Sequence, residues 1–221
     1  MTLKLYFAPG ACSFVPHSML EASGAPFEAS LVKIHKNEQK SREYLAVNPR
    51  GQVPALETGG EGATINQIVA IVLYLDAQFP QARFLPAAGA ARAKALETLA
   101  WMNNTVHPTF THFFMPDKFV EGDDAQAAMR AFNKALYATQ LEEIQAMVDA
   151  MHEAGRVYLS GDSFGPLDAY ALTLLRWGGF TGLDPRRLPV LWSHVQTIAQ
   201  LPAVARAIER ERLQLNVYKP A

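Results

Sequence analysis

Cys12 is the residue with the clearest chemical potential, because it is the single cysteine among 221 residues and lies where a strand pattern gives way to a helical one. A helix N-terminus presents unpaired N–H groups and the positive end of the helix dipole, both of which stabilise a thiolate. We therefore predict that Cys12 has a lowered pKa and a reactive sulfur. The alternative interpretation is a small buried apolar residue.

A second candidate site is the segment 48–56, with the sequence NPRGQVPAL. Pro54 stands directly before a short apolar stretch, which makes the Val53–Pro54 bond a candidate for a cis peptide. The N–H and C=O groups of Val53 would then be turned away from the sheet and free to pair with an extended peptide ligand. An ordinary trans turn is the alternative.

The elements that must position these two segments are strands and helices in alternation. Leu3, Leu5 and Phe7 alternate with polar residues, which predicts a strand, and helical spacing follows from Cys12 to Gly24. Further patterns predict a strand over 27–31, a short helix over 43–47, a strand near 55–56, a Gly-rich hairpin turn over 57–63, a strand at 64–65 and a helix capped by Asn66 that ends at Pro80.

Only helical periods are found from residue 91 onward. They predict a helix that ends at Pro108, a long helix over 125–154, a helix over 166–178 and two closing helices over 189–200 and 202–211. We therefore expect a mixed α/β domain at 1–80, a linker at 81–90 and an all-helical domain at 91–221.

Composition argues against several classes of partner. The net charge is −1, the pI is near 6.6 and no Lys/Arg cluster is interleaved with aromatic residues, so nucleic acid is not an expected partner. No leader pattern and no apolar run of about 18 residues are found, which predicts a cytoplasmic chain without a membrane span. One cysteine excludes an internal disulfide, and the isolated histidines predict no metal site.

The combination resembles the glutathione transferases, and most closely the bacterial beta class, in which a cysteine replaces the tyrosine or serine of other classes. Segments 6–13 (YFAPGACS) and 48–56 are similar to the active-site and glutathione-backbone segments of that class. Segment 105–108 (TVHP) is similar to the one that brings a histidine toward the thiol, and 164–168 resembles the folding motif of the late buried helix. The resemblance covers essentially the whole chain and implies a thioredoxin-like N-terminal domain followed by an all-α domain.

The resemblance also implies that glutathione is the co-substrate and assigns residues to it. Cys12 would face the glutathione sulfur, Val53 would pair with the cysteinyl backbone, and Gln67 would help to hold the γ-glutamyl end. The candidate catalytic residues are Cys12, Ser13 and His107. The candidate glutathione-binding residues are Tyr6, Lys36, Gln52, Val53, Pro54, Gln67 and Ile68.

Some of these assignments keep a second interpretation. The Tyr6 hydroxyl would either activate a thiol or have a structural role in the strand. The Ser13 hydroxyl would either donate a hydrogen bond to the thiol or cap the helix. His107 would either lie near the thiol or be a packing or capping residue. A second substrate would contact an apolar wall formed by Trp101, Phe110, Phe113, Phe114 and Met115. The alternative is that these side chains belong to the hydrophobic core.

Two positions depart from the family pattern. Ile68 stands where a serine usually donates a hydrogen bond to the ligand carboxylate. Gly165 stands where a serine or threonine usually caps the late helix. Of the two residues of that capping box, only Asp168 is therefore present.

The first functional hypothesis is an enzyme that conjugates glutathione to a small apolar electrophile or exchanges it through a mixed disulfide with Cys12, and the cysteine favours exchange. The alternatives are a binding protein with little turnover, which Ile68 favours, and a glutathione-dependent isomerase or dehalogenase. The resemblance implies a homodimer with a role in detoxification.

Overall fold

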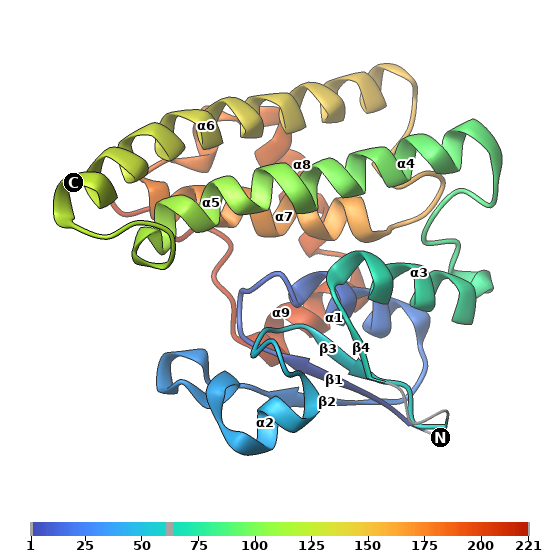
Figure 1. Ribbon diagram of the computed structural model, residues 1–221. Coiled ribbons are helices and arrows are strands. Elements are labelled where there is room, and N and C mark those ends of the chain that lie inside the picture. The colour runs from blue at the N-terminus through green and yellow to red at the C-terminus, as the bar shows by residue number, and fades with distance from the viewer. Residues whose placement is uncertain (1, 61–63, 221) are drawn as a thin grey trace.

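The computed structural model describes residues 2–60 and 64–220. A sheet with three helices forms the N-terminal half, and the rest of the chain is mostly helical (Figure 1). This confirms the predicted thioredoxin-like α/β fold followed by helices. The N-terminal elements are β1 (Leu3–Phe7), α1 (Phe14–Ser23), β2 (Phe27–Leu31), α2 (Arg42–Val47), β3 (Ala55–Glu57), β4 (Thr64–Asn66) and α3 (Ile68–Gln78).

The sheet has the strand order β2-β1-β3-β4, with β2 parallel to β1 and with β3 antiparallel to both β1 and β4. Because β1 alternates, Leu5 is fully buried on the side covered by α1 and α3, whereas Tyr6 faces the side of α2 (Figure 1). The central strand β1 therefore delivers the chain directly into the turn that carries Cys12.

The helical half consists of α4 (Gly89–Trp101), a π-helical segment (Met102–Val106), α5 (His107–Phe114), α6 (Asp123–Glu153), α7 (Pro166–Gly178), α8 (Pro189–Ala199) and α9 (Pro202–Glu211). Helix α7 is buried along nearly its whole length. The last helix, α9, returns to pack against α1 in the N-terminal half (Figure 1). Two helices of this half, α7 and α9, thus reach the turn at Cys12.

The predicted helix end at Pro108 is wrong, because the helical course continues to Phe114. Proline normally breaks a helix because it lacks an N–H and its ring clashes with the carbonyl four residues earlier. Here the N–H of His107 bonds to the carbonyl of Met102, five residues back, so the wider π turn changes the register just before the proline.

The start of α3 also differs from expectation. Asn66 is the last residue of β4 rather than a helix cap, and Gln67 occupies the N-cap position with a φ of 75°. The predicted hairpin turn lies partly outside the described residues, since 61–63 are not among them.

Helix α7 begins at a cap assembled from two segments. The Asp168 carboxylate accepts hydrogen bonds from the backbone N–H groups of Gly165 and Leu159, at 3.1 and 2.8 Å. The missing half of the capping box is supplied by Ser160, whose hydroxyl accepts from the N–H of Leu167 at 3.0 Å. A side chain at Gly165 would collide with the Phe84 carbonyl and with Ser160, which explains the glycine.

Ser160→Ala is accordingly expected to lower the free energy of unfolding by about 1 kcal/mol, the usual cost of removing an N-cap hydroxyl. Denaturant unfolding of the variant measures this. Ser163→Ala is the matched control, because Ser163 is half-buried and makes no such bond to the helix, and its effect should stay within about 0.5 kcal/mol. Equal losses in the two variants would contradict the capping role of Ser160.

Candidate functional site

Cys12 lies between β1 and α1 and is almost completely buried. Its Sγ atom is 3.6 Å from the carbonyl oxygen of Val53, which accepts the S–H proton. The Val53–Pro54 bond is cis, as predicted. The two segments that the sequence singled out are therefore neighbours in the fold, although Cys12 and Val53 are 41 positions apart in the sequence.

The predicted lowering of the Cys12 pKa is wrong for the free protein. Burial raises the pKa of this thiol to about 12, and the negative charge of Glu211 adds to the rise. The backbone N–H groups of Cys12 and Ser13 act in the expected direction and lower the pKa, but the loss of hydration outweighs them. The thiol needs a proton acceptor or a bound ligand to become reactive near neutral pH.

The loop before Val53 is held by two hydrogen bonds to one atom. The Tyr44 hydroxyl and the Asn48 side-chain amide both donate to the carbonyl of Gln52, at 2.7 and 2.6 Å. The Gln52 side chain itself is exposed, and Pro54 is buried behind the loop. The structure thus brings Val53 and Pro54 to Cys12, while Gln52 contributes its backbone to the shape of the loop.

Ser13 serves the turn rather than the thiol. Its hydroxyl donates to the carbonyl of Ala8 at 3.2 Å and accepts from the N–H of the same residue at 3.1 Å, and it makes no cap bond to α1. Tyr6 lies on the face of the sheet away from α1, and its hydroxyl donates to Glu57 at 2.8 Å. The Tyr6 contact favours its structural interpretation. Both predicted roles of Ser13 are wrong, because its hydroxyl neither caps α1 nor bonds to the thiol and instead holds the Ala8 backbone.

The remaining predicted glutathione contacts are Lys36, Gln67 and Ile68. Lys36 is exposed in a short 3₁₀ turn, Ile34–Lys36, and Gln67 is exposed at the N-cap of α3. Ile68 is only 4% exposed and belongs to the hydrophobic core. Its side chain therefore does not face a ligand, and only its backbone N–H is available for one.

Ile68→Ser is expected to act on stability, lowering the free energy of unfolding by about 2–4 kcal/mol because a buried isoleucine is truncated and a hydroxyl is placed in the core. Thermal or denaturant unfolding measures the loss. Ile34→Ser is the matched control, since Ile34 is 40% exposed, and it should change stability by less than about 0.5 kcal/mol. A stable Ile68→Ser variant with tighter glutathione binding would contradict the core assignment.

His107 starts α5 and is engaged on two sides. Its Nδ1 atom is 2.8 Å from the Tyr170 hydroxyl, and its ring packs edge-on against Trp177, with centroids 4.8 Å apart. Burial lowers the pKa of His107 to about 4, so the imidazole is neutral at pH 7. Burial also raises the pKa of Tyr170, and the charge of Cys12 raises it further.

The lowered pKa of His107 predicts a pH dependence of stability. An unfolded histidine titrates near 6.5, so between about pH 6.5 and pH 4 the unfolded chain binds the extra proton and the folded state loses stability as the pH falls. His107→Gln should flatten this part of the stability profile, whereas His35→Gln, at an exposed position, should leave it unchanged. Unfolding free energies measured at several pH values test this, and equal slopes in the wild type and His107→Gln would contradict it.

The turn carrying Cys12 is clamped from the helical half by residues that the sequence did not single out. The N–H of Gly10 donates to Glu211 at 2.8 Å, and the indole N–H of Trp177 donates to the Gly10 carbonyl at 2.8 Å. Glu211 is also 2.7 Å from Nδ1 of His17, and both of these side chains are fully buried. Gly10 has a φ of 68°, which favours glycine, and a Cβ atom there would lie 2.5 Å from the Arg176 guanidinium, which would have to move.

An aromatic surface continues from Trp177 toward solvent. Phe110 stacks on Trp177 with centroids 4.6 Å apart and on Phe114 at 5.3 Å, and Phe180 lies 5.7 Å from Phe114. Phe114 and Phe180 are 51% and 44% exposed. Of the five predicted wall residues, Phe114 thus belongs to a surface that a flat apolar molecule is able to cover, whereas Phe110 is buried in the hydrophobic core beneath it.

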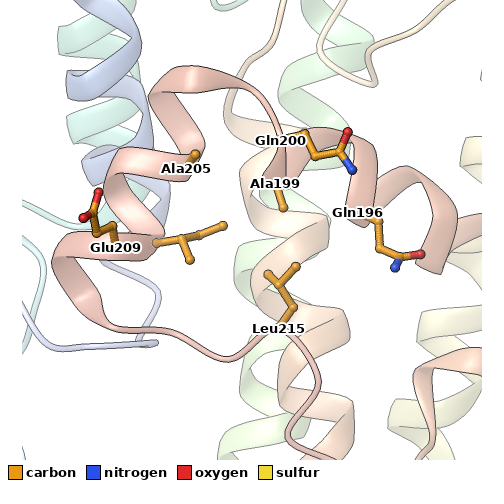
Figure 2. A pocket seen from close by; sticks show the side chains of 7 residues that line it. Gln196, Ala199, Gln200, Ala205, Glu209 and Leu215 are labelled. Carbon is orange, nitrogen blue, oxygen red and sulfur yellow. The ribbon is translucent and has the colours of Figure 1, made fainter.

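Two hollows lie away from Cys12. One of about 370 Å³ is formed by α8, α9 and Leu215, and its lining residues, labelled in Figure 2, include Gln196, Ala199 and Glu209. The other, of about 240 Å³, is lined by Tyr6, Tyr44 and neighbouring residues near α2. Within residues 2–60 and 64–220, no group of His, Cys, Asp or Glu is arranged to hold a metal ion, and no helix there is long and apolar enough to cross a membrane.

Known proteins share both the sequence and the fold. The family model "Glutathione S-transferase, N-terminal domain" matches residues 1–77. Glutathione S-transferase GstA of Escherichia coli O157:H7 is 32% identical over 96% of this chain and 100% of that protein. A sphingomonad glutathione S-transferase solved in complex with glutathione is 33% identical, with a TM-score of 0.79 over 96% of this chain and 100% of that one.

A bacterial beta class glutathione S-transferase from Sphingomonas chungbukensis is 29% identical and also has a TM-score of 0.79, over 96% of this chain and 100% of that one. The resemblance drawn from the cysteine segment and the proline segment is therefore confirmed. With 32% identity across the full length of GstA, this chain belongs to the glutathione S-transferase family.

Proposed function

We propose that this protein is a glutathione-dependent transferase in which the Cys12 thiol faces the sulfur of bound glutathione. The family supports the enzyme class, and glutathione is bound in the sphingomonad relative. The observation that carries the site is the 3.6 Å contact between Cys12 Sγ and the Val53 carbonyl, because it joins a thiol to the backbone of the cis-proline loop, and an extended backbone segment is able to pair with a peptide.

Glutathione would lie across this junction as an extended peptide. The Val53 backbone would pair with its cysteinyl residue, exposed Gln67 would contact the γ-glutamyl end, and exposed Lys36 would attract the glycyl carboxylate. Ile68 would contribute only its backbone N–H, at the positive end of α3.

Thiol exchange is the reaction that the cysteine favours. The Cys12 thiolate attacks the glutathione sulfur of a mixed disulfide, forms a Cys12–glutathione disulfide and releases the other half as a thiolate. A second glutathione thiolate then attacks this bond, releases oxidised glutathione and restores the Cys12 thiolate. The chain has no second cysteine to resolve the adduct internally, so glutathione must do so.

The second substrate would be a small apolar electrophile or disulfide resting on the exposed rings of Phe114 and Phe180, with His107 completing the catalytic group beside Cys12. We further propose a glutathione-binding domain at 1–80, a linker at 81–90, a helical domain at 91–221, a homodimeric assembly and a cytoplasmic role in detoxification.

Turnover by Cys12→Ser tests the proposal. The variant should still bind glutathione in a calorimetric titration, within about three-fold of the wild type, but lose disulfide exchange by at least about 100-fold because a hydroxyl replaces the attacking thiolate. Retained exchange activity would exclude a nucleophilic role for Cys12. Binding of glutathione by the wild type without turnover of either a disulfide or a generic electrophile would favour a binding protein instead.

A further inference from the structure

Arg176, on α7, carries a positive charge that no carboxylate pairs with. Its Nε–H donates to the backbone carbonyl of Gln214 at 2.8 Å. Within residues 2–60 and 64–220, its two Nη groups have no hydrogen-bond partner and its guanidinium forms no ion pair. The side chain is half-buried, and neither Nη atom is sealed from solvent. Arg176 therefore keeps free N–H donors that a bound molecule is able to reach.

Partial burial makes this unpaired charge costly. Loss of hydration lowers the pKa of Arg176, and the negative charge of Glu211 acts in the opposite direction. The two Glu211 oxygens are already engaged, however, one with His17 Nδ1 at 2.7 Å and the other with the Gly10 N–H at 2.8 Å. A cation that has lost part of its hydration without gaining a partner is stabilised strongly by an anion that hydrogen-bonds to it.

The guanidinium reaches both the turn that carries Cys12 and the exposed aromatic surface. A Cβ atom at Gly10 would lie 2.5 Å from Arg176 Nη1, so the glycine lets the cation approach the turn. Gly10 precedes Cys12 by two residues, which span at most about 7 Å of chain. On its other side, Arg176 Cζ is 5.6 Å from the centre of the Phe180 ring. The cation thus borders both the thiol turn and the surface proposed for the second substrate.

We infer that Arg176 is a specificity-determining residue that binds the carboxylate of an aromatic second substrate. The planar fork of a guanidinium matches the two oxygens of a carboxylate, and the exposed Phe114 and Phe180 rings offer an apolar contact for the body of the molecule. The inference rests on the proposed function for the place of glutathione, and it names the substrate class as aromatic carboxylic acids. Arg176 stays protonated and takes no part in making or breaking bonds.

Two derivatives of glutathione test this by calorimetric titration at pH 7. S-(4-carboxybenzyl)glutathione places a carboxylate beyond the sulfur, and S-(4-carbamoylbenzyl)glutathione places a neutral amide of similar shape there. The wild type should bind the carboxylate about ten-fold tighter or more, as a charge-assisted hydrogen bond provides. Arg176→Met keeps an unbranched side chain without the charge, and it should abolish this preference by weakening the carboxylate alone. Arg187→Met, at an exposed arginine before α8, is the matched control and should keep the preference.

Unsubstituted glutathione should bind wild type and Arg176→Met with affinities within about two-fold of each other, since its own carboxylates are expected elsewhere. Equal affinities of the wild type for the two derivatives would overturn the inference and leave the glutathione site in place, and this comparison needs no variant. Equal weakening of glutathione and of both derivatives in Arg176→Met would also overturn it, because Arg176 would then support the fold or glutathione itself. If neither glutathione nor a derivative bound the wild type, the proposed function would fail, and the inference with it.

Discussion

Modification of Cys12 by oxidised glutathione in the free enzyme is expected to accelerate about ten-fold for each pH unit between pH 8 and pH 10. Burial raises the pKa of this thiol to about 12, so the thiolate fraction keeps growing throughout that range. Since Cys12 is the single cysteine, the rate of mass increase of the intact protein reports this residue alone.

The same chain unfolded in denaturant is the internal control. An ordinary cysteine has a pKa near 8.5, so the rate for the unfolded chain should level off by about pH 9 to 10. A plateau near pH 7 in the folded enzyme would mean that the helix N-terminus outweighs burial, and that the prediction from sequence alone was right.

Glu211→Ala should lower the free energy of unfolding by about 3–5 kcal/mol, which is the usual cost of breaking a buried pair by removing one partner. The substitution leaves the His17 imidazole and the Gly10 N–H buried without their acceptor. Denaturant unfolding monitored by tryptophan fluorescence measures the loss.

Glu209→Ala is the matched control for that experiment, because Glu209 lies on the same helix but is exposed, and its effect should stay within about 0.5 kcal/mol. Removing Glu211 also removes a charge that raises the pKa of Cys12, so modification of the thiol at pH 8 should become faster in Glu211→Ala and not in Glu209→Ala. Similar stability in the two variants would contradict the clamp on the Cys12 turn.

The order of strands and helices followed from local patterns. Alternation in β1 and β2 and the glycine after α1 are signals carried by neighbouring residues, and the structure agrees with them. Pro108 was misinterpreted for the opposite reason, since nothing in its immediate sequence announces the π turn that accommodates it. The capping role of Ser160 could likewise not be predicted from the sequence, because Ser160 lies outside the capping-box spacing.

Half of the site was predictable and half was not. Cys12 and Val53 stand in segments with recognisable motifs, so their pairing was expected. Tyr170 and Glu211 act through contacts across 63 and 201 positions of sequence, and no spacing rule reaches that far. The predicted lowering of the Cys12 pKa was wrong for the same reason. The effects of the helix dipole and of the backbone N–H groups are local, whereas burial of the thiol depends on helices from the other half of the chain.

A crystal structure of the enzyme with glutathione tests the central claim most directly. The account predicts that the glutathione sulfur faces Cys12, that the cysteinyl backbone pairs with Val53 and that the γ-glutamyl end lies at Gln67. Glutathione bound elsewhere, for instance in the hollow between α8 and α9, with nothing beside Cys12, would contradict it.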